Sequence, residues 1–569
     1  MAKKKKKSKR SKSSRKKTSS KKEEKTPEPS LKGESTEASS KKSKGKKRPK
    51  EDAISMAAKQ RDISVSEFFA KNRHLLGFDN PSKALLTTIK EAVDNSLDAC
   101  EEASILPELA VWIKQLDEDR FKVIVEDNGP GIVKSQVPKI FGKLLYGSKF
   151  HTLKQSRGQQ GIGISAACMY AQLTTGKTVH ITSRISKSKQ AHHFEMRIDT
   201  KANSPVVVND KVIDYKHDHG TKIELELQGI YKKGRHSVDG YLQQIALANP
   251  HATITYYPPK KEGEKTKYEF KRVVNELPEE PLEILPHPYG VELGVLERMA
   301  RATKAHSIVG FLSKDFSRVS TNTAKEICKT AGIDGNRKSK DLSLEEVEKI
   351  YKAIQKTKIM APSSNCLSPI GEDWLLKGLK QNVEADFYAS TSRNPAVYRG
   401  NPFQIEIGMA WGGKLNPEDL CTLYRYANRV PLQYLQSACA ITKSAISNSW
   451  RNYGVAQSKG ALPTGPLVIL VHMASVWVPF TSESKEAIAA YPEITKELKL
   501  ALQECSRKLQ IYLRRRQREY DAAKKKSYIE KYIPHVAIAL REILELNDKQ
   551  EKKIVVTLKD TLEKSRAQT

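Results

Sequence analysis

Three polar residues in the run KEAVDNSLDA, at positions 90–99, have a spacing that could support chemistry. On a helix, which turns 100° per residue, Glu91, Asn95 and Asp98 fall within about 60° of one another. The opposite side of the same helix carries apolar residues, Leu85, Ile89, Ala92 and Val93. A carboxylate and a carboxamide one turn apart can hold a hydrated Mg²⁺ and position a water molecule for attack. Taken alone, the pattern is more typical of a solvated helix face.

A second motif, EDNGPGI at positions 126–132, places a carboxylate beside two glycines. At the end of a strand, Asp127 could accept a hydrogen bond from an adenine amino group, while Gly129 and Gly131 would let the backbone approach the base. In isolation, the motif is equally typical of an ordinary Asp-Asn-Gly loop.

A third motif, RGQQGIGI at positions 157–164, leads into an apolar run. Glycines ahead of a helix N-terminus expose backbone N–H groups that suit phosphate oxygens. The order of Gly158, Gly161 and Gly163 is the reverse of the dinucleotide-binding fingerprint, and the motif does not follow a strand directly. The motif therefore indicates a phosphate cradle of another kind.

Two further runs resemble functional motifs but fit them poorly. The run GKT at 176–178 looks like the end of a P-loop, but Ala171 stands where the first P-loop glycine belongs, and a strand-like run follows. The run DED at 117–119 could be taken for the DxD of a metal-dependent strand-cleavage centre, but it falls in a predicted turn between two strands. We predict no site at either.

The elements that would position these motifs follow from the hydrophobic pattern. Asn80 before Pro81 predicts an N-cap and a helix from Ser82 to about Ser104. A second helix should follow the glycine motif and end near Leu173. Strands are expected at 109–116, 120–126, 178–185, 192–198 and 221–227. Helix, hairpin, glycine loop, helix and further strands predict a two-layer α+β sandwich.

Beyond this region the pattern changes twice. Residues of about 285–365 read as short helices, broken at Gly310, Gly332 and Gly335. Strand patterns return from Phe387, and a long helix is predicted after Pro492. Its apolar seam comprises Ile494, Leu498, Leu502, Cys505, Leu509 and Leu513, and its other faces are basic.

The composition suits a protein that handles nucleic acid. The 569 residues have room for about three or four domains and carry a net charge of +33. Residues 1–50 hold 22 Lys or Arg against 5 acids and no aromatic residue, so this tail cannot bury enough surface to fold. The tail would attract nucleic acid without sequence preference, or serve as a solubilising or targeting extension.

The cysteines and the apolar runs limit the cellular setting. Seven cysteines stand singly with no CxxC pair, which argues against a structural zinc site built on cysteines and against disulfides, and favours a reducing compartment. The most apolar stretch, 467–480, is interrupted by His472 and Ser475 and is too short to span a membrane. We expect no contact with a membrane.

In this order, the three motifs resemble those of the GHKL (Bergerat) ATPase superfamily of type II topoisomerases, MutL proteins, heat-shock chaperones and histidine kinases. The wording EAVDNSLDA, EDNGPGI, RGQQGIGISA and VPFTSESKEAI is similar to that of the B subunits of type IIB DNA topoisomerases, the topoisomerase VI family. The resemblance covers about residues 60–545 and leaves out the basic tail.

The resemblance implies roles for individual residues. Glu91 would be the general base, Asn95 would ligate Mg²⁺, and Asp127 would bind the adenine of ATP. Ser148 and Lys149 would touch the nucleotide, and Thr221 would lie near the base. Lys485 would reach the γ-phosphate from another domain and report the nucleotide state to it, unless it is a solvated lysine in the first turn of a helix. The phosphates would be wrapped by Gly158, Gln159, Gln160, Gly161, Ile162, Gly163, Ile164 and Ser165.

The resemblance also implies an architecture and partners. It predicts a tail at 1–55, a GHKL ATPase domain at 60–283, a helix–two-turn–helix domain at 284–366, a transducer at 367–545 with a long C-terminal helix, and a second tail at 546–569. ATP with Mg²⁺ would close two B subunits around double-stranded DNA, and a separate A subunit would cleave a second duplex within an A₂B₂ heterotetramer. The expected setting is cytoplasmic and DNA-associated, as in archaea, or nuclear in a eukaryote.

Two other functions remain open at this point. A MutL-like ATPase of DNA repair would use the same ATP chemistry. A non-catalytic scaffold related to the topoisomerase VI B subunits would bind the same partners but would have lost the base or the glycine motif, whereas Glu91, Asn95 and Asp127 are all present.

Overall fold

The computed structural model describes residues 53–60, 62–149, 152–158, 161–234, 236–260, 266–482 and 484–567. The predicted basic tail at 1–55 therefore lies almost wholly outside the described residues. The chain divides into two compact units, Met1–Asp62 and Ile63–Thr569. In the first, only the short helix α1 (Ala53–Ala58) is described as a regular element. No helix in the described ranges is long and apolar enough to cross a membrane.

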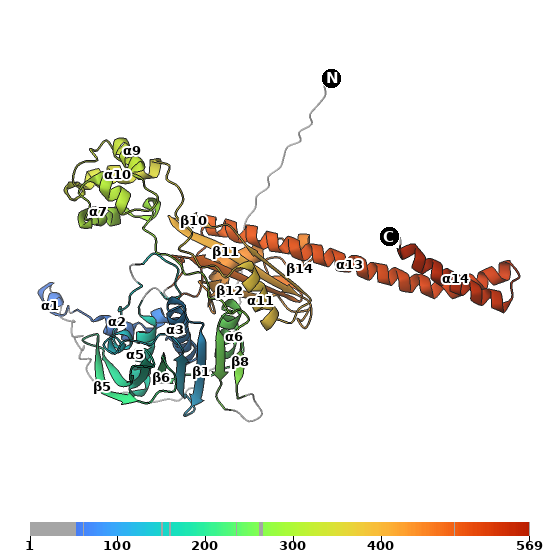
Figure 1. The fold of residues 1–569 in the computed structure, drawn as a ribbon, viewed down its shortest axis with the longest axis horizontal. Coiled ribbons are helices and arrows are strands. Elements are labelled where there is room, and N and C mark those ends of the chain that lie inside the picture. Colours follow the sequence, from blue (N-terminus) through green and yellow to red (C-terminus); the bar gives the residue numbers. More distant parts are fainter. Residues whose placement is uncertain are drawn as a thin grey trace, which may run out of the picture. The chain divides into compact units, whose positions relative to one another are not determined.

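The first part of the larger unit is built on a mixed eight-stranded sheet (Figure 1). Its strand order is β5-β4-β3-β6-β2-β1-β7-β8, and neighbours are antiparallel except β1 and β7. The strands are β1 (Glu108–Gln115), β2 (Arg120–Asp127), β3 (Val179–Arg184), β4 (Ala191–Asp199), β5 (Ser204–Ile213), β6 (Gly220–Gln228), β7 (Thr253–Tyr257) and β8 (Tyr268–Phe270).

Helices α3 and α5 lie next to each other against one face of this sheet (Figure 1). Leu85 and Ile89 of α3 pack with Val123 of β2 and Ile223 of β6 in one apolar core, so this part of the fold has a helical layer and a strand layer. The helices of this part are α2 (Val65–Lys71), the 3₁₀ turn η1 (Arg73–Leu76), α3 (Pro81–Glu102), α4 (Val137–Gly142), α5 (Gly163–Thr175) and α6 (Val238–Ala248).

The predicted elements of this part are confirmed with small shifts at their ends. The Asn80 side chain accepts hydrogen bonds from the N–H groups of Ser82 and Lys83, as an N-cap does, and α3 runs to Glu102. The run 117–119 forms the turn between β1 and β2. Gly176 ends α5 in the left-handed conformation and β3 follows, so this glycine is a helix C-cap and not part of a P-loop.

The segment expected to be a helix–two-turn–helix domain forms a separate helical cluster. Its core includes Leu296, Phe311, Ile327 and Ile350, one from each of its four helices. The elements are the 3₁₀ turn η2 (Pro288–Gly290), α7 (Leu293–Ala302), α8 (Ile308–Lys314), α9 (Thr321–Ala331), the 3₁₀ turn η3 (Ser339–Asp341) and α10 (Leu344–Lys356).

The third part contains a second, mixed sheet. Its strand order is β10-β11-β16-β12-β13, with β9 also paired to β11 and with β12 and β16 parallel. The strands are β9 (Phe387–Ser392), β10 (Ala396–Tyr398), β11 (Asn401–Trp411), β12 (Thr422–Ala427), β13 (Val430–Pro431) and β16 (Leu467–Ser475), beside the small pair β14 (Ala456–Gln457) and β15 (Pro463–Thr464). The helices are α11 (Glu372–Asn382), α12 (Ala440–Ser447) and the 3₁₀ turns η4 (Gln436–Ala438) and η5 (Trp450–Tyr453).

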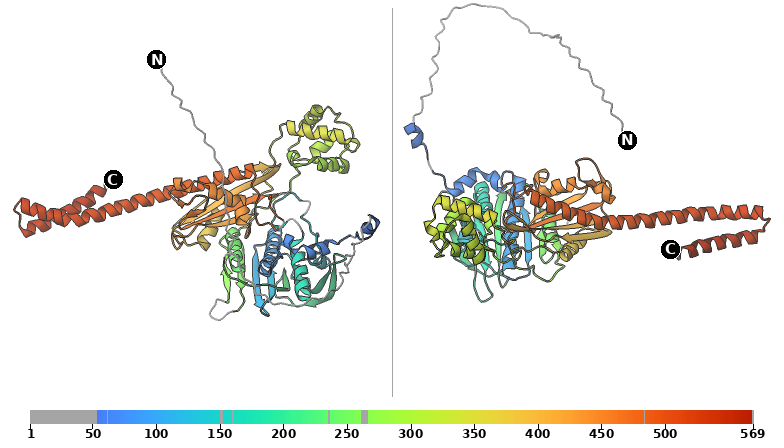
Figure 2. Two further views of the ribbon diagram at one scale, coloured as in Figure 1. Left: turned by 180° about the vertical axis from the view of Figure 1, so that it is seen from behind. Right: turned by 90° about the horizontal axis from the view of Figure 1, so that it is seen from above.

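The predicted long helix is α13 (Pro492–Ile543). Ile494, Leu498, Leu502, Cys505 and Leu509 are buried against the second sheet, which confirms the predicted apolar seam. The segment 546–569, expected to be a tail, holds a further helix, α14 (Asp548–Ala567), which folds back along α13 (Figure 2).

Candidate functional site

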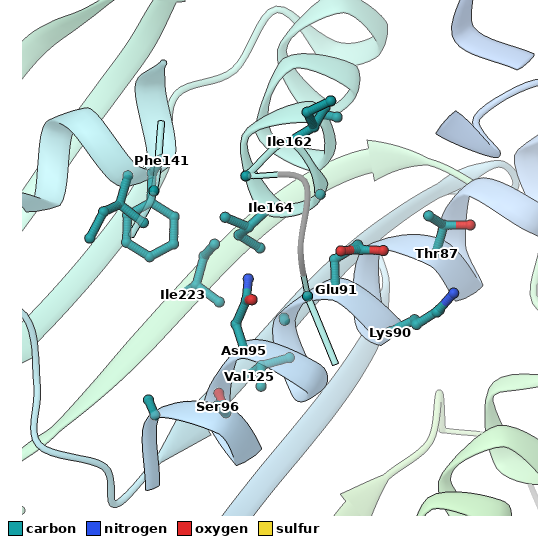
Figure 3. A pocket seen from close by; sticks show the side chains of 18 of the residues that line it. Thr87, Lys90, Glu91, Asn95, Ser96, Val125, Phe141, Ile162, Ile164 and Ile223 are labelled. Carbon is teal, nitrogen blue, oxygen red and sulfur yellow. The ribbon is translucent and has the colours of Figure 1, made fainter. Parts of the chain in front are cut away.

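Helix α3 presents two of its three predicted polar residues to a large cavity. Glu91 is half-buried and Asn95 is exposed, and both line the cavity. Figure 3 shows both side chains rising from α3 toward the segment that carries Ile162 and Ile164. Neither makes a hydrogen bond or ion pair with another described residue, so both side chains remain available to a ligand.

Glu91 has room only because residue 163 is glycine. A Cβ atom built on Gly163 would lie 1.7 Å from Glu91 Oε2, well inside contact distance. The carboxylate therefore lies directly against the first residue of α5. The N-cap position, Ile162, offers no side-chain cap, so the first N–H groups of α5 have no side-chain partner there. Such a helix start favours an anion.

The rest of the glycine motif lies at the same edge of the cavity. Gly158, Gly161, Ile162, Gly163 and Ile164 line it, and Gly161 has a positive φ of 56° that favours glycine. Ser165 is buried, donates its hydroxyl to the Ile162 carbonyl and does not line the cavity. Gln159 and Gln160 lie outside the described residues.

Asp127 ends β2 as a buried carboxylate with one acceptor position left. Its Oδ1 accepts the N–H groups of Gly129 at 2.9 Å and Thr221 at 3.1 Å, and its Oδ2 accepts the Ser96 hydroxyl at 2.7 Å. A carboxylate oxygen can accept two hydrogen bonds, so Oδ2 can take one more, for example from an amino group. Burial raises the pKa of Asp127, against the opposing effect of these donors.

The cavity has a volume of about 600 Å³, which is typical of small-molecule sites. Asp127 and Thr221 lie on its wall, together with Val125 and Ile223, which give it apolar surface. Ser148 and Lys149 line it as well, and Ser148 is exposed. The third part of the fold completes the wall with Pro431, Gln433, Tyr434, Ser484, Lys485 and Glu486.

Lys485 reaches the cavity from the loop before α13. It is half-buried, has a positive φ of 53°, and donates to the Arg157 carbonyl at 3.4 Å. Burial lowers the pKa of its ammonium group, against the raising effect of Glu91. The alternative that Lys485 is a solvated lysine in the first turn of a helix is therefore wrong.

The neighbour of Lys485 holds the same loop against α3. Glu486 forms an ion pair with Lys83 at 2.6 Å, and Lys83 also pairs with Asp79 at 3.3 Å. Burial would lower the pKa of Lys83, but its two carboxylate partners raise it. Sequence reasoning missed this pair, because no local pattern distinguishes Glu486 from a solvated glutamate.

Asp98 does not join Glu91 and Asn95 at the cavity. It is buried and pairs with Lys149 at 2.5 Å and with Arg157 at 2.8 Å. Arg157 also pairs with Glu101 at 2.7 Å, and Glu101 accepts from His251 at 2.7 Å. Burial would raise the pKa of Asp98, but the two cations lower it. The third polar residue of the predicted stripe is thus part of a buried ion network that anchors Lys149 and the start of the glycine motif.

The residues present fit a hydrated magnesium ion. The Asn95 carboxamide oxygen lies 3.7 Å from the position of a Cβ on Gly158, so the glycine keeps this edge of the cavity open beside it. Carboxylate and amide oxygens are ligands that Mg²⁺ accepts, usually together with water and phosphate oxygens.

Family models match two parts of the chain. Residues 80–204 match the histidine kinase-, DNA gyrase B- and HSP90-like ATPases, and residues 362–525 match the transducer of the topoisomerase VI B subunit. The fold and the site thus define the class, an ATPase of the GHKL type joined to a transducer.

Proteins named as the B subunit of type 2 DNA topoisomerase 6 resemble the chain over most of its length. The protein of Methanococcoides burtonii is 50% identical over 87% of this chain and 79% of its own, and that of Archaeoglobus fulgidus is 47% identical over 86% and 81%. The chain belongs to this family. Among solved structures, the ATPase region of Saccharomyces cerevisiae topoisomerase II shows 11% identity and a TM-score of 0.37 over 80% of this chain and 99% of that one.

Proposed function

We propose that the chain binds and hydrolyses ATP in this cavity and that the cycle drives DNA strand passage with a separate A subunit. One observation carries the proposal: Glu91, Asn95, Asp127 and the glycine motif, which are spread over 73 positions from 91 to 163, line a single cavity. Family membership favours this function over a MutL-like role in repair.

Each wall of the cavity suits one part of ATP. The remaining acceptor position on Asp127 Oδ2 suits the adenine amino group, and Val125 and Ile223 give the base an apolar surface. The start of α5 and the glycine motif suit the phosphates. Glu91, which has no partner among the described residues, would take the proton of the attacking water as general base.

Asn95 would hold Mg²⁺ through its side-chain oxygen. The ion, when bound, would neutralise negative charge on the phosphates. Ser148, Lys149 and Thr221 would lie close to the nucleotide, although Lys149 would share its charge with Asp98 and Glu102. Gln159, Gln160 and Ser165 stay predictions from the motif.

Lys485 would connect the nucleotide to the second sheet. Its ammonium group lies in a half-buried position with the Arg157 carbonyl as a weak partner, so a γ-phosphate would be a much better one. Hydrolysis and phosphate release would remove that partner. The loop that leads into α13 would then be free to shift.

The relatives' names imply the partners. The chain would pair with an A subunit in an A₂B₂ assembly and would act on double-stranded DNA, and two copies of the chain would close on each other when ATP binds. A cytoplasmic, DNA-associated setting, or a nuclear one in a eukaryote, follows from the same proposal.

Relaxation of supercoiled DNA tests the proposal. The chain and the A subunit of the same source are mixed with supercoiled plasmid, with and without Mg-ATP, and Glu91→Gln serves as the matched variant. We expect relaxation only with both subunits and ATP, and none with the variant. ATP-independent relaxation, or relaxation that survives in the variant, would contradict it.

The same experiment separates the enzyme from the scaffold alternative. A scaffold would co-purify with the A subunit but would neither hydrolyse ATP nor support relaxation. The presence of Glu91, Asn95 and the glycine motif at one cavity favours the enzyme.

A further inference from the structure

A cluster of two histidines and one glutamate lies on the sheet of the ATPase part, away from the ATP cavity. His180 is on β3, and His193 and Glu195 are on β4. Their ligand atoms all lie within 4.8 Å of one another, and all three side chains are half-buried. None of the three lines the cavity described above.

The strand register places the three residues on one face. His180 is directly opposite Glu195, and Thr182 is directly opposite His193. Because side chains alternate along a strand, the odd-numbered neighbours Val179 and Ile181 point to the other face. Those two residues belong to the core under α3 and α5, so the cluster lies on the face turned away from these helices.

The two imidazole rings are arranged as a pair of metal ligands would be. His180 Nδ1 and His193 Nε2 lie 3.3 Å apart. Two nitrogen ligands on a tetrahedral zinc ion, each about 2.0–2.1 Å from the metal, are separated by about 3.3 Å. The same distance also fits a direct N–H···N hydrogen bond between the rings.

The outer nitrogen of each ring has its own partner. Thr182 Oγ1 lies 2.9 Å from His193 Nδ1, and Thr178 Oγ1 lies 3.4 Å from His180 Nε2. Such partners fix the tautomer and orientation of a ligating imidazole and turn its other nitrogen toward the metal. Both threonines therefore aim the facing nitrogens at one point.

Glu195 supplies a carboxylate that is not otherwise engaged. It makes no hydrogen bond or ion pair with the residues that the structure describes. The next carboxylate on this face, Glu224, is already paired with Lys122 at 2.8 Å and Lys222 at 2.9 Å. These pairs also compensate the charge of Lys222, the nearest cation on this face, which lies opposite Thr182.

We propose that His180, His193 and Glu195 bind one divalent transition-metal ion, with zinc as the preferred ion. Two imidazoles and one carboxylate are a ligand set that zinc accepts, and a water molecule would complete the tetrahedron. The ion would link β3 to β4 on the uncovered face of the sheet. It would add stability to this hairpin without entering the ATP chemistry.

Metal titration of the full-length chain tests this proposal. After treatment with a chelator, the chain is titrated with Zn²⁺ by calorimetry and with Co²⁺ by visible absorption, which reports tetrahedral coordination. We expect one ion per chain at this site. His180→Ala, His193→Ala and Glu195→Gln should each weaken binding by about 100-fold or more, since even loss of an outer-shell partner costs 10- to 100-fold.

His192→Ala is the matched control. His192 precedes His193 on β4, but it points to the opposite side of the strand and lies near Asp210 of β5 at 3.4 Å. This variant should bind zinc as the unmodified chain does. Glu195→Gln keeps the shape of a half-buried side chain, so it remains informative if a histidine variant fails to fold.

Two results would overturn the proposal. One is a chelator-treated chain that takes up no zinc and gives no tetrahedral Co²⁺ spectrum, which would leave the ring contact as a hydrogen bond only. The other is zinc uptake that is the same in all three cluster variants as in His192→Ala. A rise in melting temperature with zinc that disappears in Glu195→Gln would support the link between β3 and β4.

Discussion

The Glu91 carboxylate and the Gly163 backbone occupy a space that has no room for a methyl group. In Gly163→Ala, the new Cβ would lie 1.7 Å from Glu91 Oε2, so the carboxylate must move away from the start of α5. A displaced general base forfeits much of its effect, which is about 10²- to 10⁴-fold in rate. We expect kcat for ATP to fall by at least about tenfold, measured by steady-state phosphate release.

Gly294→Ala is the control for this substitution. A Cβ on Gly294, which lies in α7, would meet no atom within 4 Å. Its ATPase rate should therefore match that of the unmodified chain. Equal rates in both alanine variants would show that Glu91 does not need its place beside Gly163.

At this scale the sequence predicted the residues whose partners are near in the chain. Glu91 and Asn95 share one helix face, and Asp127 ends a strand before a Gly turn, so pattern alone predicted both. The network of Asp98, Arg157 and Glu101 could not be predicted in this way. Its members come from two elements more than fifty positions apart, and only the tertiary fold brings them together.

The loop before α13 joins two elements through the cavity, and Lys485 is its residue at the cavity wall. In Lys485→Ala, the cation that would face the γ-phosphate is lost, while adenine binding through Asp127 is not touched. We expect kcat to fall about tenfold or more with a smaller change in ATP affinity, and relaxation to become uncoupled from the remaining hydrolysis.

Lys459→Ala provides the comparison, because Lys459 is an exposed lysine in the same part of the fold. Phosphate release and plasmid relaxation are measured in parallel for both variants. If Lys485→Ala hydrolyses ATP and relaxes DNA as Lys459→Ala does, Lys485 has no part in the coupling.

A buried pair joins strands β11 and β16 to the start of α11. Glu406 accepts hydrogen bonds from the N–H groups of Ile370 at 2.8 Å and Gly371 at 2.7 Å and from His472 at 2.7 Å. The Arg429 N–H donates to the other His472 nitrogen, so the His472 ring is neutral and donates to Glu406 through Nδ1. Burial lowers the pKa of His472.

The pKa of Glu406 gives this pair a pH dependence of known sign. Burial would raise that pKa, but His472 and the two N–H donors hold it below its usual value. A carboxylate with a lowered folded-state pKa contributes stability above its unfolded pKa, about 4.3, and loses it as the pH falls through the folded value.

Glu406→Gln should therefore lower the apparent melting temperature by several degrees at pH 7.5, because an amide cannot accept every one of these hydrogen bonds. The difference from the unmodified chain should stay constant down to about pH 5 and narrow below about pH 4.3. Thermal unfolding between about pH 7.5 and 3.5 measures this. A difference that widens toward acid would reverse the predicted sign.

Elements with a clear period were predicted from the sequence, and elements without one were not. The N-cap at Asn80 and the seam of α13 are strong local signals. Strand β5 was missed because most of its residues are exposed on both faces, so it lacks the alternation of a half-buried strand. Helix α14 was missed for a related reason, since it packs along the exposed end of α13 and has few buried residues.

At the scale of the whole molecule, charge is distributed unevenly along the chain. Residues 1–50 hold 22 Lys or Arg against 5 acids, and no described residue of the ATP cavity comes from this tail. Deletion of residues 1–50 should reduce the slope of log K for DNA binding against log salt, because fewer phosphate contacts release counterions. The ATPase rate should stay within about twofold.

Fluorescence anisotropy with a labelled duplex at several salt concentrations measures that slope, and phosphate release measures the ATPase rate. An unchanged slope would remove the tail from the DNA-binding surface. A collapsed ATPase rate would mean that the tail acts on the catalytic part.

The central claim is that this one cavity holds ATP and that Glu91 activates the attacking water there. The most direct test compares the purified chain with Glu91→Gln for both Mg-ATP binding, by calorimetry, and phosphate release. The account predicts similar affinity for Mg-ATP in the two proteins and a rate in the variant that is lower by about 10²-fold or more. Turnover that is unchanged in Glu91→Gln, or a chain that binds no Mg-ATP, would contradict it.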